Sequence, residues 1–148
     1  MLLRTIILLG VFLFVGMLSA TAKENKDLMR AQYYYVHCAY YDAIPYYEKV
    51  AGEVNTSAVY AELGDCYYVT NNFGKASASY AKAVKMPGCR PAVVLRYAQL
   101  LMQLMDYGEA EKWLKEYQKT YKSDIRVANL LAGCNAARAA LDAIPPGV

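Results

Sequence analysis

Small, aromatic and polar residues alternate at helical spacing between Tyr60 and Ala83. The small and apolar positions fall three or four residues apart, as they do along one face of an α-helix. They are Tyr60, Leu63, Gly64, Tyr67, Ala76, Tyr80 and Ala83. Because the turn-forming pair Asn71-Asn72 interrupts the series, the pattern predicts two helices joined by a short turn. Gly64 and Ala76 would let these helices cross closely, and the tyrosines would fill the space beside the crossing.

The same pattern recurs on both sides of this segment. Ala43 and Ala110 stand at positions equivalent to Ala76, one before it and one after it, each at a period of about 34 residues. The first helices of these two flanking units carry Ala31 and Ala98 in the small position. Since self-similarity at this period indicates stacked repeats, the sequence predicts three helix pairs in series.

One more helix is expected after the third pair, roughly from Asp124 to Ala143. Leu131 and Ala132 occupy the positions in this helix that Leu63 and Gly64 occupy in the central unit. Pro145-Pro146 then stops the series where a partner helix would begin. A lone helix at the end of a repeat stack covers the last pair, so this segment is expected to be a cap.

The repeating unit resembles the tetratricopeptide repeat (TPR), a helix-turn-helix motif of this period. The resemblance implies an all-α fold: a TPR α-solenoid of three helix-turn-helix repeats plus a C-terminal capping helix. We expect one domain over residues 23–143, with repeats at about 24–56, 57–90 and 91–124, the capping helix over 125–143 and a tail over 144–148. Turns inside the repeats are expected at Ala39–Tyr41, Asn71-Asn72 and Asp106–Gly108. Pro45 would then lie in the first turn of its helix, where a missing N–H costs little.

The N-terminal segment, residues 1–22, has the pattern of a signal peptide. Arg4 forms a short positive region, Ile6–Leu18 is almost entirely apolar, and Ala20-Thr21-Ala22 matches a small-x-small cleavage pattern. We therefore expect an exported protein whose mature chain begins at Lys23, with the final compartment left open. An uncleaved membrane anchor is the alternative, although the apolar run is shorter than the ~20 residues that a spanning helix needs.

The composition gives little information about a binding partner, but its tyrosine content needs an explanation. Apolar types make up 57% and charged types 20% of the 148 residues, as in an ordinary globular domain. The formal net charge is +3 and falls by one when Arg4 is removed, so net charge indicates neither nucleic acid nor anionic lipid as a partner. Tyrosine is unusually frequent, with 15 copies against 3 Phe and 1 Trp. About half of these fall on predicted packing positions: Tyr34, Tyr47, Tyr60, Tyr67, Tyr80, Tyr97 and Tyr117.

The sequence contains four cysteines, Cys38, Cys66, Cys89 and Cys134. In an exported protein they could form disulfides, and their spacing matches no metal site. Three of them are expected within or at the end of helices among apolar neighbours, which favours buried free thiols. If a bridge exists, Cys38–Cys66 is the pairing to test first.

Because a TPR stack curves, the first helix of each repeat lines its concave groove. Ten positions of these helices and of the capping helix are expected to bind a partner: Gln32, Tyr35, Glu62, Asp65, Tyr68, Arg96, Gln99, Met102, Gln103 and Asn129. Leu28, Met29, Leu130 and Gly133 would line the groove beside them. This mixture of aromatic, thioether, amide and charged groups suits an extended or helical peptide better than a small molecule.

Of two other interpretations of the groove, the first stays open and the second is disfavoured. The groove could be solvated and idle, with binding by an edge or by the convex side. Clamps that hold a peptide's C-terminal carboxylate place Lys and Arg here, whereas Glu62 and Asp65 are acidic and only Arg96 is basic. A carboxylate clamp is therefore disfavoured.

No catalytic or cofactor site is predicted. The single histidine, His37, is expected at a helix end, and its neighbour Cys38 would point away from it. The sequence contains neither a Gly-rich phosphate loop nor zinc-ligand spacing. We expect a non-catalytic protein without cofactor or metal; a thiol-based redox enzyme is the alternative, and it would need a cysteine of low pKa.

Several stretches resemble a particular group of TPR proteins, the exported envelope proteins with OmpA-like domains, including the PorE type associated with type IX secretion. These stretches are residues 41–49, 63–67, 96–99, 107–114 and 129–134. In that family a β-propeller and a peptidoglycan-binding OmpA-like domain follow the TPR module, and this sequence contains neither. The resemblance implies a periplasmic, possibly outer-membrane-associated scaffold that binds a protein or peptide segment of an envelope or secretion complex. From the charge pattern and the apolar runs of the sequence, we expect no nucleic acid as a partner and no direct membrane insertion after signal cleavage. The alternative is a truncated or split relative of that family with a purely structural role.

Overall fold

The computed structural model describes residues 25–145, and the secondary structure in this range is entirely helical. The expected signal peptide (residues 1–22) and residues 146–148 of the expected tail lie outside the described residues. Within residues 25–145, seven helices follow one another: α2 (Lys26–Val36), α3 (Tyr40–Ala51), α4 (Ser57–Val69), α5 (Phe73–Ala83), α6 (Pro91–Gln103), α7 (Tyr107–Thr120) and α8 (Ile125–Asp142). Within this part of the chain, no helix is both long and apolar enough to cross a membrane.

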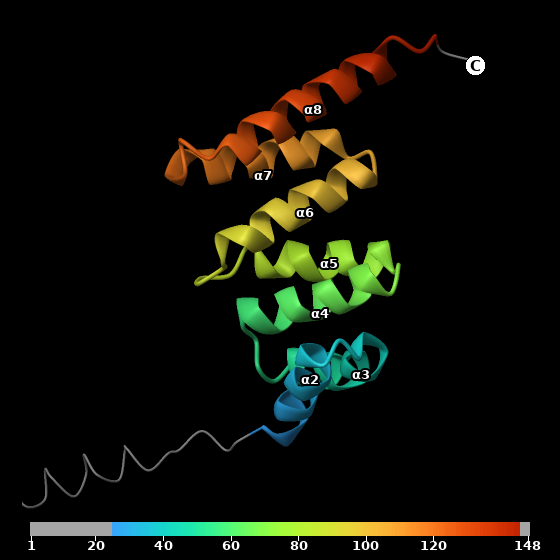
Figure 1. Ribbon diagram of the computed structural model, residues 1–148, viewed down its shortest axis with the longest axis vertical. Helices are drawn as coiled ribbons and strands as arrows, with labels where there is room; N and C mark the ends of the chain where they lie inside the picture. The colour runs from blue at the N-terminus through green and yellow to red at the C-terminus, as the bar shows by residue number, and fades with distance from the viewer. Residues whose placement is uncertain (1–24, 146–148) are drawn as a thin grey trace, which may run out of the picture.

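The helices pack in sequential pairs, α2 with α3, α4 with α5 and α6 with α7, and α8 packs on α7 and also reaches α6 (Figure 1). Residues 37–39, 70–72 and 104–106, which connect the helices of each pair, lie along one long side of the stack, called here the turn edge. The connections between pairs, residues 52–56, 84–90 and 121–124, lie along the opposite side, called here the loop edge. The predicted all-α stack of three helix pairs and a final helix is confirmed.

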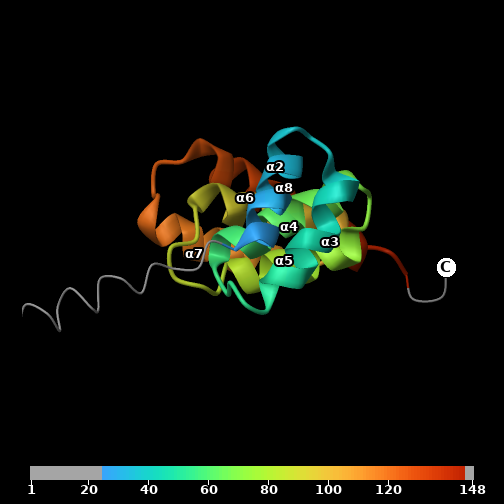
Figure 2. The ribbon, with the colours of Figure 1, turned by 90° about the horizontal axis from the view of Figure 1, so that it is seen from below.

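Viewed along the stack, α2, α4, α6 and α8 lie toward one side and α3, α5 and α7 toward the other (Figure 2). The surface formed by α2, α4, α6 and α8 is called here the first-helix face. It is the face that the sequence assigns to partner binding.

The small residues of the repeat pattern lie where the helices cross. Ala31, Ala43, Ala76, Ala98 and Ala110 are all fully buried. At Gly64, an added Cβ would stand 2.7 Å from Cδ1 of Tyr80, which is closer than carbon atoms approach one another. The sequence pattern therefore predicted the helix crossings correctly, including the one that requires glycine.

Tyrosine is used in the core because its hydroxyl reaches polar partners. Of the seven tyrosines predicted at packing positions, Tyr34 is half-buried and the other six are buried. Five buried or half-buried tyrosines donate hydrogen bonds to carboxylates, namely Tyr35, Tyr47, Tyr67, Tyr80 and Tyr117. The Tyr60 hydroxyl instead donates to the carbonyl of Ala51 at 2.9 Å. Phenylalanine would fill the same space but leave these acceptors unpaired, which explains the tyrosine excess in part.

Each turn inside a helix pair has the same backbone conformation. Cys38, Asn71 and Met105 have φ of 58°, 59° and 62°. In the first turn, the N–H of Cys38 donates to the carbonyl of Tyr35, and that of Ala39 donates to the carbonyl of Tyr34. This is the Schellman pattern, in which a left-handed residue ends the helix and satisfies its last carbonyls. In these three turns the left-handed position is occupied by residues other than glycine.

These tight turns correct two expectations. Tyr41 and Gly108 were expected in turns, but α3 already begins at Tyr40 and α7 at Tyr107, because the left-handed residue reverses the chain within three residues. Pro45 consequently lies inside α3, in its second turn, and not in the first turn as expected. It therefore removes an N–H that would bond within the helix, and its exposed position makes that loss tolerable.

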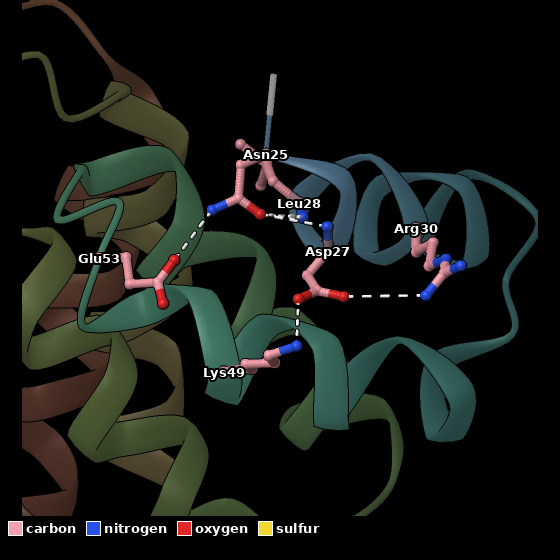
Figure 3. A network of polar contacts seen from close by, with 6 residues as sticks. All are labelled: Asn25, Asp27, Leu28, Arg30, Lys49 and Glu53. Carbon is pink, nitrogen blue, oxygen red and sulfur yellow. Dashed lines mark hydrogen bonds and ion pairs between the residues drawn. The ribbon is translucent and has the colours of Figure 1, made fainter. Parts of the chain in front are cut away.

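The start of α2 is held by polar contacts (Figure 3). The side chain of Asn25 caps the helix by accepting from the N–H groups of Asp27 and Leu28, each at 3.1 Å. Asp27, which stands where the repeat pattern favours an apolar residue, forms ion pairs with Arg30 and with Lys49 of α3. Charged pairing at this end thus replaces the apolar packing found between the inner helices.

Candidate functional site

Three of the predicted groove residues come together around one buried carboxylate. Asp65 of α4 is only 6% exposed. The Tyr35 hydroxyl from α2 donates to its Oδ2 at 2.7 Å, and the Tyr80 hydroxyl from α5 donates to its Oδ1 at 2.5 Å. Arg96 of α6 forms an ion pair with the same Oδ1. One carboxylate therefore links four helices that belong to all three helix pairs.

This cluster satisfies itself and does not offer a free charge. A buried carboxylate without partners would be strongly unfavourable, and here two hydroxyls and a guanidinium compensate it. Burial, followed by the hydrogen bond to Asp65, raises the pKa values of both Tyr35 and Tyr80, so both hydroxyls stay protonated donors. Tyr35, Asp65 and Arg96 thus position the first-helix face, and the Arg96 side chain stays half-buried, 41% exposed.

Glu62 has a similar internal partner. It accepts a hydrogen bond of 2.6 Å from the hydroxyl of Tyr47, a fully buried residue of α3. Burial and this bond raise the pKa of Tyr47. The two acidic residues that were predicted to face a partner are therefore both engaged with tyrosines of the stack.

The remaining predicted residues differ in exposure. Gln32, Tyr68, Gln99, Gln103 and Asn129 are exposed, and Tyr68 lies against Phe73 with a ring separation of 5.6 Å. Met102 is half-buried and packs toward α8, since a Cβ on Gly133 would meet its terminal methyl at 3.3 Å. The exposed amides and Tyr68 are thus the groups free to contact a partner, whereas Met102 joins two helices.

A hollow of about 420 Å³ lies between α6 and α8 on the first-helix face. It is lined by Ala92, Leu95, Arg96, Gln99, Arg126, Asn129 and Leu130. Its floor is aliphatic and its rim carries two amides and two guanidinium groups. Such a lining fits a short stretch of peptide, whose backbone groups pair with amides while an apolar side chain enters the floor.

Four residues of this hollow were predicted from the sequence to line the groove: Arg96, Gln99, Asn129 and Leu130. Ala92, Leu95 and Arg126 were not predicted. Arg126 lies three residues before Asn129 on α8, so the helical spacing that selected Asn129 could have found it. Its guanidinium is held by Asp124, with Nε and Nη2 at 2.9 and 2.6 Å from the two carboxylate oxygens. The hollow therefore brings together residues of the last pair and the final helix, but Gln32, Tyr68 and Gln103 lie outside it.

The thiols and the histidine show no pairing for nucleophilic chemistry. All four cysteines are free thiols, and Cys38 is exposed, contrary to the expectation that it is buried among apolar neighbours. Its place at the left-handed turn position directs it to solvent. Burial raises the pKa of Cys66 to about 12 and also raises that of Cys134, which disfavours the thiolate. His37 ends α2 as expected, with Nδ1 2.7 Å from the carbonyl of Tyr33. Within residues 25–145, no group of three or more His, Cys, Asp or Glu is placed to hold a metal ion.

Comparison with known proteins supports the repeat assignment. Residues 79–134 match a tetratricopeptide-repeat family. No curated protein matches the sequence significantly. The solved structures that resemble this fold are TPR domains of chaperones and adaptors, and the predicted TPR α-solenoid is confirmed.

Three of these structures illustrate the similarity. The second TPR domain of human RPAP3, in complex with the HSP70 peptide SGPTIEEVD, is 14% identical with a TM-score of 0.63, over 74% of this chain and 92% of that one. The Yersinia enterocolitica type III secretion chaperone SycD, in complex with a peptide of the translocator YopD, is 22% identical with a TM-score of 0.65, over 81% and 96%. Yeast Tom70 is 21% identical with a TM-score of 0.67, over 74% of this chain and 23% of Tom70.

Proposed function

We propose that this TPR fold is a non-catalytic adaptor that holds a segment of another protein on its first-helix face. The observation that carries the proposal is the hollow between α6 and α8, where exposed Gln99 and Asn129 flank an aliphatic floor. Similar folds are found with short peptides of HSP70 and of the translocator YopD. A segment in extended or helical form is the ligand that this combination of amides and apolar surface fits best.

We further propose that the adaptor works in the cell envelope, as part of an envelope or secretion assembly. This rests on the signal-peptide pattern of residues 1–22 and on the resemblance to the TPR module of exported OmpA-like proteins. Cell fractionation followed by N-terminal sequencing tests it. A periplasmic or outer-membrane fraction whose protein begins at Lys23 supports the proposal, and retention of residues 1–22 in a cytoplasmic fraction contradicts it.

Photo-crosslinking tests the binding face directly. A crosslinking amino acid is placed at Gln99 or at Asn129, with Glu116 on α7 as the control, because α7 lies on the other side of the stack (Figure 2). A discrete adduct with the same protein from both face positions, and none from Glu116, supports the proposal. Equal crosslinking from all three positions would place binding elsewhere.

A matched pair of variants then measures the contribution of the face. Replacing Tyr68, Gln99 and Asn129 together by alanine removes exposed contacts, while Lys115, Glu116 and Gln118 of α7 provide the control triple. Since central contact residues commonly contribute more than about 1 kcal/mol, we expect the first triple to weaken binding by about tenfold or more at unchanged helicity. Tyr35 and Arg96 are unsuitable for this test because both bond the buried Asp65, so their loss would also lower stability.

A further inference from the structure

Basic residues gather along the loop edge. They lie in its connections or in the helical turns beside them: Lys26, Lys49, Lys82, Lys85, Arg90, Lys119, Lys122 and Arg126. On the turn edge, residues 36–42, 69–74 and 103–108 contain neither Lys nor Arg. Lys75, in the first turn of α5 beside the turn edge, pairs with Glu48. The stack thus carries more cations along its loop edge than along its turn edge, a polarity that the net charge of +3 does not reveal.

Part of this charge is neutralised within the fold, and part is not. Lys49 pairs with Asp27, Lys119 with Glu116 and Arg126 with Asp124. At the first junction, Glu53 accepts a hydrogen bond from Asn25 (Figure 3), and the loop of residues 52–56 contains no basic residue. At the other two junctions, Lys85, Arg90 and Lys122 form no ion pair with any described residue. Lys82 lies over the ring of Tyr60, 5.1 Å from its centre, and adds its charge to the same edge.

Apolar side chains are exposed among these cations. Tyr121 is 43% and Ile125 is 70% exposed, and they flank Lys122 along the chain. In the loop of residues 84–90, Pro87 is exposed between Lys85 and Arg90. Burying an aromatic and an aliphatic side chain while basic groups stay at the headgroup level is how peripheral proteins attach to bilayers.

We propose that the loop edge docks this protein peripherally on a bilayer with anionic headgroups. Lys82, Lys85, Arg90 and Lys122 face the headgroup phosphates, and Tyr121 and Ile125 enter the interface between them. An acidic protein surface would account for the cations alone, whereas an anionic bilayer also accommodates the exposed Tyr121 and Ile125 that flank Lys122. Of the loop-edge basic residues, only Arg126 also lines the hollow of the first-helix face. The inference does not depend on the proposed adaptor function.

Vesicle co-sedimentation of the mature chain tests the proposal. The probes are phosphatidylcholine vesicles with and without phosphatidylglycerol. Each basic residue near an anionic surface contributes about 1 kcal/mol, or about fivefold in partition. The triple Lys85→Gln, Arg90→Gln, Lys122→Gln is therefore expected to bind anionic vesicles about a hundredfold less well than the wild type. The control triple, Lys75→Gln, Lys112→Gln, Lys115→Gln, has the same net charge but lies off the loop edge and is expected to lose much less.

A second pair of variants separates the apolar contribution. Tyr121→Ser with Ile125→Ser is expected to lower the binding that remains when ionic strength rises to about 0.5 M, where charge attraction is screened. Val36→Ser with Tyr41→Ser removes two exposed apolar side chains of the turn edge and is expected to leave it unchanged. All variants have the same N-terminus, so any contribution of the N-terminus to vesicle binding is the same in every variant. Equal binding by the two triples, equal binding to both vesicle types, or no binding to anionic vesicles would each overturn the proposal.

Discussion

The hydroxyl of Tyr80 lies 2.5 Å from Oδ1 of Asp65, and both residues are buried. Tyr80 also packs over Gly64, one residue before Asp65. The second helix of the central pair therefore both fills the crossing with α4 and satisfies the carboxylate that Arg96 and Tyr35 approach from the neighbouring pairs. This places packing and charge compensation at a single point in the middle of the stack.

Asp65→Asn should destabilise the fold by about 2–3 kcal/mol, because it leaves the half-buried Arg96 without its counter-charge. Tyr35→Phe and Tyr80→Phe should each cost about 1 kcal/mol, the value of a hydrogen bond lost with its shape retained. Chemical denaturation followed by circular dichroism measures these changes. Glu53→Gln, on an exposed carboxylate, is the control, with an expected change of less than about 0.5 kcal/mol. A D65N protein as stable as that control would show that Asp65 does not hold the three pairs together.

Gly64→Ala should lower stability by about 1–3 kcal/mol, although alanine favours helices, since its Cβ meets the buried ring of Tyr80 at 2.7 Å. Gly74→Ala is the matched control, because nothing lies within 4 Å of its Cβ position in α5. It should raise stability by about 0.5–1 kcal/mol through helix propensity alone. The difference in melting temperature between the two variants is the measurement, and changes of the same sign would contradict the packing described at this crossing.

Met105→Gly should stabilise the fold by about 0.5–1 kcal/mol, because its φ of 62° is strained for any residue with a Cβ. Met29→Gly provides the comparison, since Met29 is exposed inside α2 and glycine there should cost about 1 kcal/mol. Thermal unfolding of both variants tests this. Destabilisation by Met105→Gly would mean that the exposed methionine makes contacts worth more than its backbone strain.

Stability should fall as pH rises above about 10. Burial and hydrogen bonds to carboxylates raise the pKa values of Tyr35, Tyr47, Tyr67 and Tyr80 above their ordinary value of 10.0. A raised pKa in the folded state contributes stability that is complete below the unfolded value and is lost above it, because the unfolded chain releases the proton first. Denaturant midpoints between about pH 8 and about pH 11 measure the slope. Tyr47→Phe should reduce that slope by one proton.

For the acidic and tyrosine residues of the candidate site, the sequence predicts the shared face but not the contacts between the side chains. Helical spacing placed Tyr35, Asp65 and Arg96 on one face, and the structure does bring them together. Their spacing along the chain does not reveal that they bond one another, since partners in successive repeats meet only after the helix pairs have stacked. The same limit applies to the hollow, which needs α8 to pack beside α6 before Arg126 and Gln99 line one space.

The repeating pattern of the sequence is enough to predict the helix pairs, because small residues that recur once in every repeat permit close helix crossings only in a repeating stack. It determined most of the core for the same reason, with Ala31, Ala76 and Ala98 all fully buried as the pattern requires. Which polar groups are paired inside the fold and which stay free depends instead on how the helices pack against one another. Asp65 is consumed by three donors, while Lys85, Arg90 and Lys122 gather on one edge, because both outcomes depend on distances between helices that the chain order does not encode.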